Sequence, residues 1–124
     1  MKIYFDGGCR PNPGNMETAV VAGGTTYHRT DHGCGDNNDA EWLALIDALN
    51  VARDLSVSDV TLFGDSATVI GHVNGESRRL PSRFHDYHAK FSELVSGLHR
   101  VRIRRVARTQ NLAGISLVRL HGRL

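Results

Sequence analysis

The chain has 124 residues, a length that suits one domain with one hydrophobic core. Hydrophobic residues make up 40% of it and charged residues 23%, a balance typical of a soluble globular protein. No apolar run approaches the roughly 18 residues of a membrane helix, so the sequence predicts no membrane segment.

The charge is unevenly distributed behind a net value of +2. Residues 1–93 hold 8 Lys and Arg against 13 Asp and Glu, whereas residues 94–124 hold 7 Arg and no acid. Such asymmetry favours an anionic partner. A solvated basic face is the other reading, and charge alone does not separate the two.

Two further observations concern the cellular compartment in which the protein is expected. Cys9 and Cys34 lack metal-ligand spacing and make no disulfide framework, which favours a reducing cytoplasm. Met1 leads directly into strand-like residues, so we expect no signal peptide.

The first half of the chain has short strand signals followed by one long helix. "MKIYF" (1–5) is β-prone and ends at Asp6-Gly7-Gly8, and residues 18–29 indicate one or two strands broken near Gly23-Gly24. Residues 32–38 are turn-forming. Helical spacing begins at Asp39 and continues to Leu55, with apolar stripes formed by Leu45, Ala48, Ala52 and Leu55 and by Trp42, Ile46 and Leu49.

The second half of the chain alternates strands and helices. The pattern predicts a buried strand over 59–64, a short helix from Asp65-Ser66 to about Asn74-Gly75, and a helix over 84–98. Residues 100–107 alternate like a strand, and Asn111 can cap a last helix that runs to Leu120. The order of elements predicts a single α/β domain over 1–124, with a mixed sheet and helices on its faces.

Three acids stand out by their positions at the ends of these elements. Asp6 follows the first strand, Glu41 lies in the first turn of the long helix, and Asp65 follows the strand 59–64. Ligands of α/β sheets gather outside the carboxyl ends of strands, where two of these acids lie. We therefore expect the three carboxylates to meet.

Each acid also has a purely structural explanation. Asp6 could belong to a turn with Gly7, and Asp65 could simply cap the helix that follows it. Glu41 lies three residues after Asn38, so the two could form a capping-box-like pair. Glu41 also lies on the stripe that faces the core, where a lone carboxylate is very costly to bury.

Taken together, clustered acids are the ligands that hard cations need. Magnesium prefers oxygen ligands, usually one or two carboxylates per ion with water and substrate phosphate. Two such ions can clamp the attacking and leaving oxygens of a phosphodiester displacement.

Four motifs in order carry a family resemblance. "YFDGGCRPNPG" (4–14), "NNDAEWLAL" (37–45), "LFGDSATVI" (62–70) and "QNLAGISLV" (110–118) resemble the corresponding motifs of type 1 ribonuclease H. The resemblance implies a five-stranded mixed sheet flanked by helices, and endonucleolytic cutting of the RNA strand of RNA–DNA hybrids. It also implies Mg²⁺ as the cofactor, with Mn²⁺ as a substitute, and no organic cofactor.

The same resemblance assigns roles to residues. Asp6 would bridge two divalent ions, and Glu41 and Asp65 would hold the ion on the leaving-group side. Asn12, Asn37 and Asn38, with the backbone near Gly8 and Cys9, would contact ribose 2′-hydroxyls, and Ser66 would add a polar contact. From charge and loop placement alone, we expect phosphate contacts from Arg10, Arg78, Arg79 and Arg83.

The chain departs from the family pattern in three places. Ile115 stands where the family has its fourth carboxylate, which supports the ion that activates the attacking water. "ARTQ" (107–110) lacks the histidine that many relatives carry there. The segment 75–83 is too short for the basic extension with which some relatives grip the hybrid.

Three functions therefore remain open. The leading one is a magnesium-dependent ribonuclease H that works with three acids, slowly. The second is a hybrid-binding module without catalysis, which Ile115 would explain, and the third keeps the fold as a protein-interaction domain. His85 and His88, three apart on one helix, could be a metal pair, but an exposed position or a role at the edge of the core is favoured.

Overall fold

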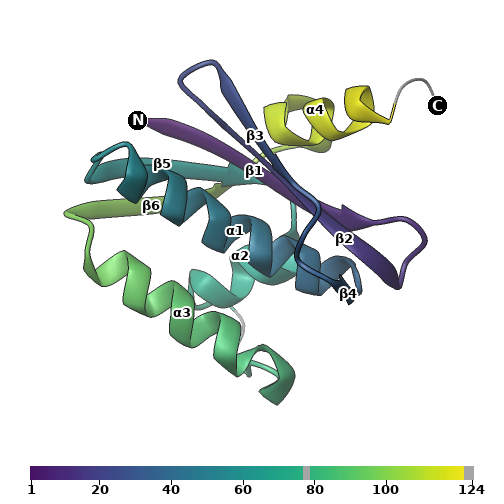
Figure 1. Cartoon of the computed structure of the whole chain (residues 1–124). Helices are drawn as coiled ribbons and strands as arrows, with labels where there is room; N and C mark the ends of the chain where they lie inside the picture. Colours follow the sequence, from purple (N-terminus) through teal and green to yellow (C-terminus); the bar gives the residue numbers. More distant parts are fainter. Residues whose placement is uncertain (77–78, 122–124) are drawn as a thin grey trace.

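The computed structural model describes residues 1–76 and 79–121 (Figure 1). Its centre is a mixed sheet with strand order β3-β2-β1-β5-β6. The strands are β1 (Lys2–Cys9), β2 (Gly14–Ala22), β3 (Thr25–Arg29), β5 (Asp59–Gly64) and β6 (Arg100–Arg105), and the two-residue β4 (Cys34–Gly35) pairs with β2.

Strand direction changes at β1, the central strand. On one side β1 pairs antiparallel with β2, which pairs antiparallel with β3. On the other side β1 pairs parallel with β5, and β5 with β6. The β1–β5 ladder covers only Lys2 to Tyr4, whereas the β1–β2 ladder continues to Cys9, so half of β1 extends beyond the end of β5.

Helices cover both faces of this sheet (Figure 1). The long helix α1 (Asn37–Asp54) lies on one face together with α2 (Ala67–Val73) and α3 (His85–Ser96), and α4 (Leu112–Leu120) lies on the other. Short 3₁₀ turns, η1 (Ser82–Phe84) and η2 (Arg108–Gln110), precede α3 and α4. None of the helices in the described ranges is long and apolar enough to cross a membrane.

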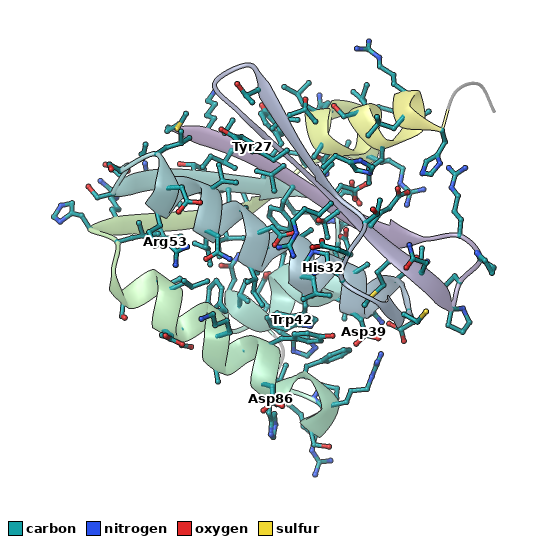
Figure 2. All side chains as sticks on the ribbon, in the orientation of Figure 1. Tyr27, His32, Asp39, Trp42, Arg53 and Asp86 are labelled. Carbon is teal, nitrogen blue, oxygen red and sulfur yellow. The ribbon has the colours of Figure 1, made fainter. Side chains whose placement is uncertain are left out.

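The main core lies between the sheet and α1. The residues of the two apolar stripes predicted for α1 are buried, with one exception. Leu55, the C-cap of the helix, is 41% exposed. Trp42 points away from the strands toward α3, where its ring lies 6.2 Å from that of Tyr87 and 6.0 Å from that of Phe84 (Figure 2). A single helix therefore joins the sheet to the aromatic cluster beneath α3.

The predicted fold class is confirmed, with corrections at several boundaries. The strand 59–64, the break at Gly23-Gly24 and the Asn111-capped last helix are as expected. The first strand does not end at Asp6, because pairing with β2 continues to Cys9. The long helix begins at Asn37 rather than Asp39, because Asp36 and Asp39 form its capping box.

The later elements are slightly shorter than predicted. The second long helix covers His85–Ser96 and the last strand ends at Arg105. The helix expected to begin at Asp65-Ser66 begins at Ala67, and Ser66 is its N-cap, with Oγ accepting a hydrogen bond from the Val69 amide at 3.2 Å.

Gly7 sets how closely α1 approaches β1. A Cβ at Gly7 would lie 2.1 Å from the Ala40 carbonyl oxygen, a backbone atom that cannot move alone. We expect Gly7→Ala to lower the free energy of unfolding by about 3 kcal/mol through overpacking, measured by urea denaturation. Gly8→Ala is the matched control, because its Cβ would meet nothing nearer than the Asn37 Oδ1 at 3.7 Å. Equal effects of the two substitutions would contradict this account.

Candidate metal centre

The three predicted acids meet where β1 continues past the end of β5. Asp6 lies on that extension of β1, Asp65 directly follows β5, and Glu41 comes from the first turns of α1. One carboxylate oxygen of each lies within 4.8 Å of those of the other two. The expectation that strand ends and a helix start would bring the acids together is confirmed.

Glu41 is a buried acid that takes no part in capping. Asp36 and Asp39 cap α1, so Glu41 is left to face the sheet with only 6% of its surface exposed. Its Oε1 accepts a hydrogen bond from the Gly7 amide at 2.5 Å. The capping-box reading of Glu41 with Asn38 is therefore wrong, and the core-facing reading is confirmed.

Asp65 is held by a buried asparagine. Asn111 Nδ2 donates to Asp65 Oδ2 at 2.9 Å and to the Phe5 carbonyl oxygen at 3.0 Å, and its Oδ1 accepts from the Ala113 amide at 3.1 Å. Asn111 is 0% exposed. This one amide joins β1, the end of β5 and the start of α4. The sequence indicated only its capping role, because its other two partners are distant in the chain.

The carboxylates raise one another's proton affinity. Burial, and next the charge of Asp65, raise the pKa of Asp6 from 3.8 to about 6. Burial, and next the charge of Asp6, raise the pKa of Glu41 well above its ordinary value. A set of three oxygen donors with this much uncompensated negative charge fits a hard divalent cation, which would offset the repulsion.

An open groove of about 730 Å³ lies over the three acids. Residues predicted to bind substrate form one part of its wall, namely Gly8, Cys9, Arg10, Asn37, Asn38 and Ser66. Asn37 Oδ1 accepts from the Cys9 amide at 3.1 Å, and Asn12 Oδ1 accepts from the Asn37 amide at 3.1 Å. The structure thus joins Asn12, Asn37 and the end of β1 in one hydrogen-bonded group, while Asn38 lines the groove beside it.

Helix α4 forms the opposite part of the wall. Ile115 lines the groove with Asp6, Glu41 and Asp65, so an aliphatic side chain stands beside the acids. Gly114 packs directly against the site, since a Cβ there would lie 3.3 Å from Asp6 Oδ2. Glu17 of β2 and His121 at the end of α4 complete this side.

The four arginines predicted to contact phosphate are dispersed. Arg10 lines the groove, Arg79 is exposed elsewhere, and Arg78 lies outside the described residues. Arg83 Nη2 donates to Asp36 Oδ2 at 2.8 Å, an ion pair that ties η1 to the start of α1. Phosphate contact by these residues stays a prediction.

Sequence reasoning missed Arg108 as a groove residue. It lines the groove and also an adjoining hollow of about 510 Å³ beside Asp65, and its charge lowers the pKa of Asp6. Arg108 closely follows β6, whose last residue Arg105 pairs with Gly64 next to Asp65. This place in the chain was the signal that could have predicted a position near the acids.

The histidine pair at 85 and 88 does not form a metal site in the described part of the chain. His88 packs edge-on against Trp42 with ring centroids 6.2 Å apart, and His85 Nε2 lies 3.2 Å from the Leu80 carbonyl oxygen. The favoured reading, an exposed position or one at the edge of the core, is confirmed, because His85 is exposed and His88 packs against the buried Trp42.

The raised pKa of Asp6 predicts a pH-dependent stability without metal. An acid with a higher pKa in the folded chain stabilises it when protonated, so this contribution is lost as the pH rises from about 4 through 6. We expect a loss on the order of 2–3 kcal/mol. Asp6→Asn should remove it, as measured by urea unfolding in a chelator at several pH values.

The control for this measurement is Asp54→Asn, whose side chain is 71% exposed at the end of α1. Its unfolding free energy should follow the parent chain across the same pH range. A parent chain and an Asp6→Asn variant with equal pH slopes would contradict the electrostatic description of the site.

Comparison with known proteins places this geometry in a family. A family model described as reverse transcriptase-like matches residues 15–121. Ribonuclease HI of Halobacterium salinarum is 34% identical over 118 residues, which cover 87% of this chain and 57% of that protein. The chain thus spans little more than half the length of this relative.

Solved structures agree with the family match. The crystal structure of RNase H1 from Halobacterium salinarum superimposes with a TM-score of 0.83 at 31% identity, covering 94% of this chain and 92% of that one. The N-terminal RNase H domain of a Mycobacterium tuberculosis protein gives 0.79 at 25% identity, covering 94% and 93%. LC11-RNase H1 in complex with an RNA/DNA hybrid gives 0.77 at 23% identity, covering 94% and 91%, which supports the fold alone. The chain therefore belongs to the reverse transcriptase-like family and is similar to type 1 ribonucleases H over nearly its whole length.

Proposed function

We propose that this chain is a divalent-metal-dependent endoribonuclease that hydrolyses the RNA strand of RNA–DNA hybrids. The observation that carries the proposal is the convergence of Asp6, Glu41 and Asp65 within 4.8 Å under a groove walled by amide side chains. The similarity to ribonuclease HI over 87% of the chain supports the same activity. Mg²⁺ is the proposed ion, with Mn²⁺ as a substitute.

The carboxylates would hold the ion or ions. Asp6 lies between the other two elements on the central strand, which suits a bridging role, and Asn111 fixes the orientation of Asp65. When bound, the metal would stabilise the charge that develops on the attacking and leaving oxygens of the phosphodiester. The Gly7 amide and the Asn111 amide keep the protein ligands in place, so little reorganisation is needed.

The asparagine wall would recognise the RNA strand. Amide side chains can both donate to and accept from a ribose 2′-hydroxyl, which is the group that distinguishes RNA from DNA. Asn12 Oδ1 accepts from the Asn37 backbone amide and Asn37 Oδ1 accepts from the Cys9 amide, so both side chains are oriented and each keeps its NH₂ group for a ligand. RNase H1 of the LC11 type, which has the same fold, is known in complex with an RNA/DNA hybrid, and we propose the same class of ligand here.

Ile115 favours a second candidate function, a hybrid-binding module without catalysis. An isoleucine at the groove wall cannot ligate a metal, and no acid follows Glu93 in the sequence. We favour slow catalysis, because all three acids of the site are oriented and their charges are left for a cation to offset. We also propose that the protein is located in the cytoplasm and that Arg10 contacts a phosphate of the hybrid.

Cleavage of an end-labelled RNA–DNA hybrid tests the proposal. We expect Mg²⁺- or Mn²⁺-dependent cuts in the RNA strand and none in duplex DNA. Asp65→Asn should lower the rate at least 100-fold while leaving hybrid affinity, measured in a chelator, within a few-fold of the parent. Hybrid binding without cutting above the Asp65→Asn background would identify the binding module. Absence of both cutting and hybrid binding would point to a protein-interaction domain.

Restoring a carboxylate at position 115 gives a second test. Ile115 lines the groove together with the three acids, so Ile115→Asp should add a metal ligand. We expect it to raise the Mg²⁺-dependent cleavage rate by about tenfold. Ile115→Asn, similar in size but uncharged, is the matched control. Circular dichroism should show that both variants fold, because a new carboxylate without an ion is costly near buried acids. Equal rates for both variants would show that ligand charge does not limit turnover.

A further inference from the structure

Glu17 is an acid of the groove wall that the three-carboxylate site does not include. It lies on β2 opposite Gly8 of β1, two positions along the ladder from the pair formed by Asp6 and Ala19. Alternate residues of a strand share a face, so Glu17, Ala19 and Asp6 all lie on the side that α4 covers. Glu17 lines the same groove as Asp6, Glu41 and Asp65.

No side chain of β1 projects between Glu17 and Asp6, because Gly8 is the residue opposite Glu17. Gly8 has no side chain, and a Cβ there would meet nothing nearer than 3.7 Å. A glutamate has three rotatable bonds, so its carboxylate can cross this gap toward Asp6 without moving the backbone. A diagonal neighbour two residues along an antiparallel ladder is within reach of a long side chain.

The present partners of Glu17 are two imidazoles. Its Oε2 lies 3.2 Å from His28 Nε2 on β3, and its Oε1 contacts His121 Nε2 at the end of α4. The Glu17 side chain is 13% exposed, and no Lys or Arg in the described ranges forms an ion pair with it. Its carboxylate is thus largely withdrawn from water, and its partners in the described ranges are these two imidazoles.

Other acids near the groove are engaged elsewhere. Asp36 and Asp39 cap α1 and pair with Arg83. Asp47 lies on the opposite face of the sheet, where it accepts from Thr18 and pairs with Arg29. Glu17 is therefore the remaining carboxylate along the described lining of this groove that is available to a cation.

We propose that Glu17 supplies from β2 the carboxylate that Ile115 does not supply from α4, and so acts as a fourth metal ligand. The inference rests on the proposed metal-dependent function. Glu17 and Ile115 line the same side of the groove, next to Asp6, and a carboxylate arriving over Gly8 would reach the cation from that side. His28 and His121 would hold the side chain at the groove edge until a divalent cation attracts it.

Manganese binding tests the inference without relying on catalysis. Electron paramagnetic resonance or titration calorimetry would compare the parent chain with Glu17→Gln, and with Glu93→Gln as an exposed control on α3. We expect Glu17→Gln to weaken Mn²⁺ binding at least tenfold and Glu93→Gln to leave it unchanged. Glu17→Asp keeps the charge but has a shorter side chain, so it should give an intermediate Mn²⁺ affinity. It replaces Glu17→Gln as the test variant if Glu17→Gln does not fold.

A double variant distinguishes a ligand from a structural residue. If Glu17 substitutes for an acid at position 115, then Ile115→Asp should restore Mn²⁺ affinity and cleavage to the Glu17→Gln chain. A loss in Glu17→Gln that Ile115→Asp does not restore would overturn the inference. So would unchanged Mn²⁺ affinity in Glu17→Gln when Asp65→Asn lowers it. Unchanged affinity in both single variants would instead overturn the proposed metal-dependent function.

Discussion

The mutual repulsion of three carboxylates is the constraint on which the rest of this structure depends. Asp6, Glu41 and Asp65 approach within 4.8 Å although one of them is almost fully buried. Such an arrangement persists only because backbone and amide donors hold it, and because burial elsewhere supplies the stability. The tight packing of α1 on Gly7 and the buried Asn111 provide that support. The site is thus built into the junction of β1, β5, α1 and α4.

Local patterns were enough to predict the acids and the order of elements. Strand ends and a helix start are encoded within a few residues, so Asp6, Glu41 and Asp65 could be found from position alone. Helix caps were harder, because Asp36, Asn38 and Asp39 all have capping chemistry and only the backbone decides among them. Distant partners could not be predicted at all. The bonds from Asn111 to Phe5 and Asp65 join residues 106 and 46 positions apart.

The two walls of the groove differ in chemistry. The wall formed by β1 and α1 consists of amides and backbone groups that are already hydrogen-bonded to one another. The wall formed by α4 is aliphatic at Ile115, Leu117 and Val118 and polar at Arg119 and His121, and Glu17 of β2 lies next to it. The two walls therefore differ mainly beside the acids, where one offers hydrogen-bonding groups and the other offers the aliphatic Ile115 side chain.

Asn111 also links α4 to the three acids, although the helix itself contributes no acid to the site. The residue that begins this helix is the same one that aims Asp65 and binds the Phe5 carbonyl. Displacing the helix would release a carboxylate and expose the central strand. The position of α4 is therefore tied to the orientation of Asp65. α4 thus supports the site through its N-cap residue rather than through a carboxylate of its own.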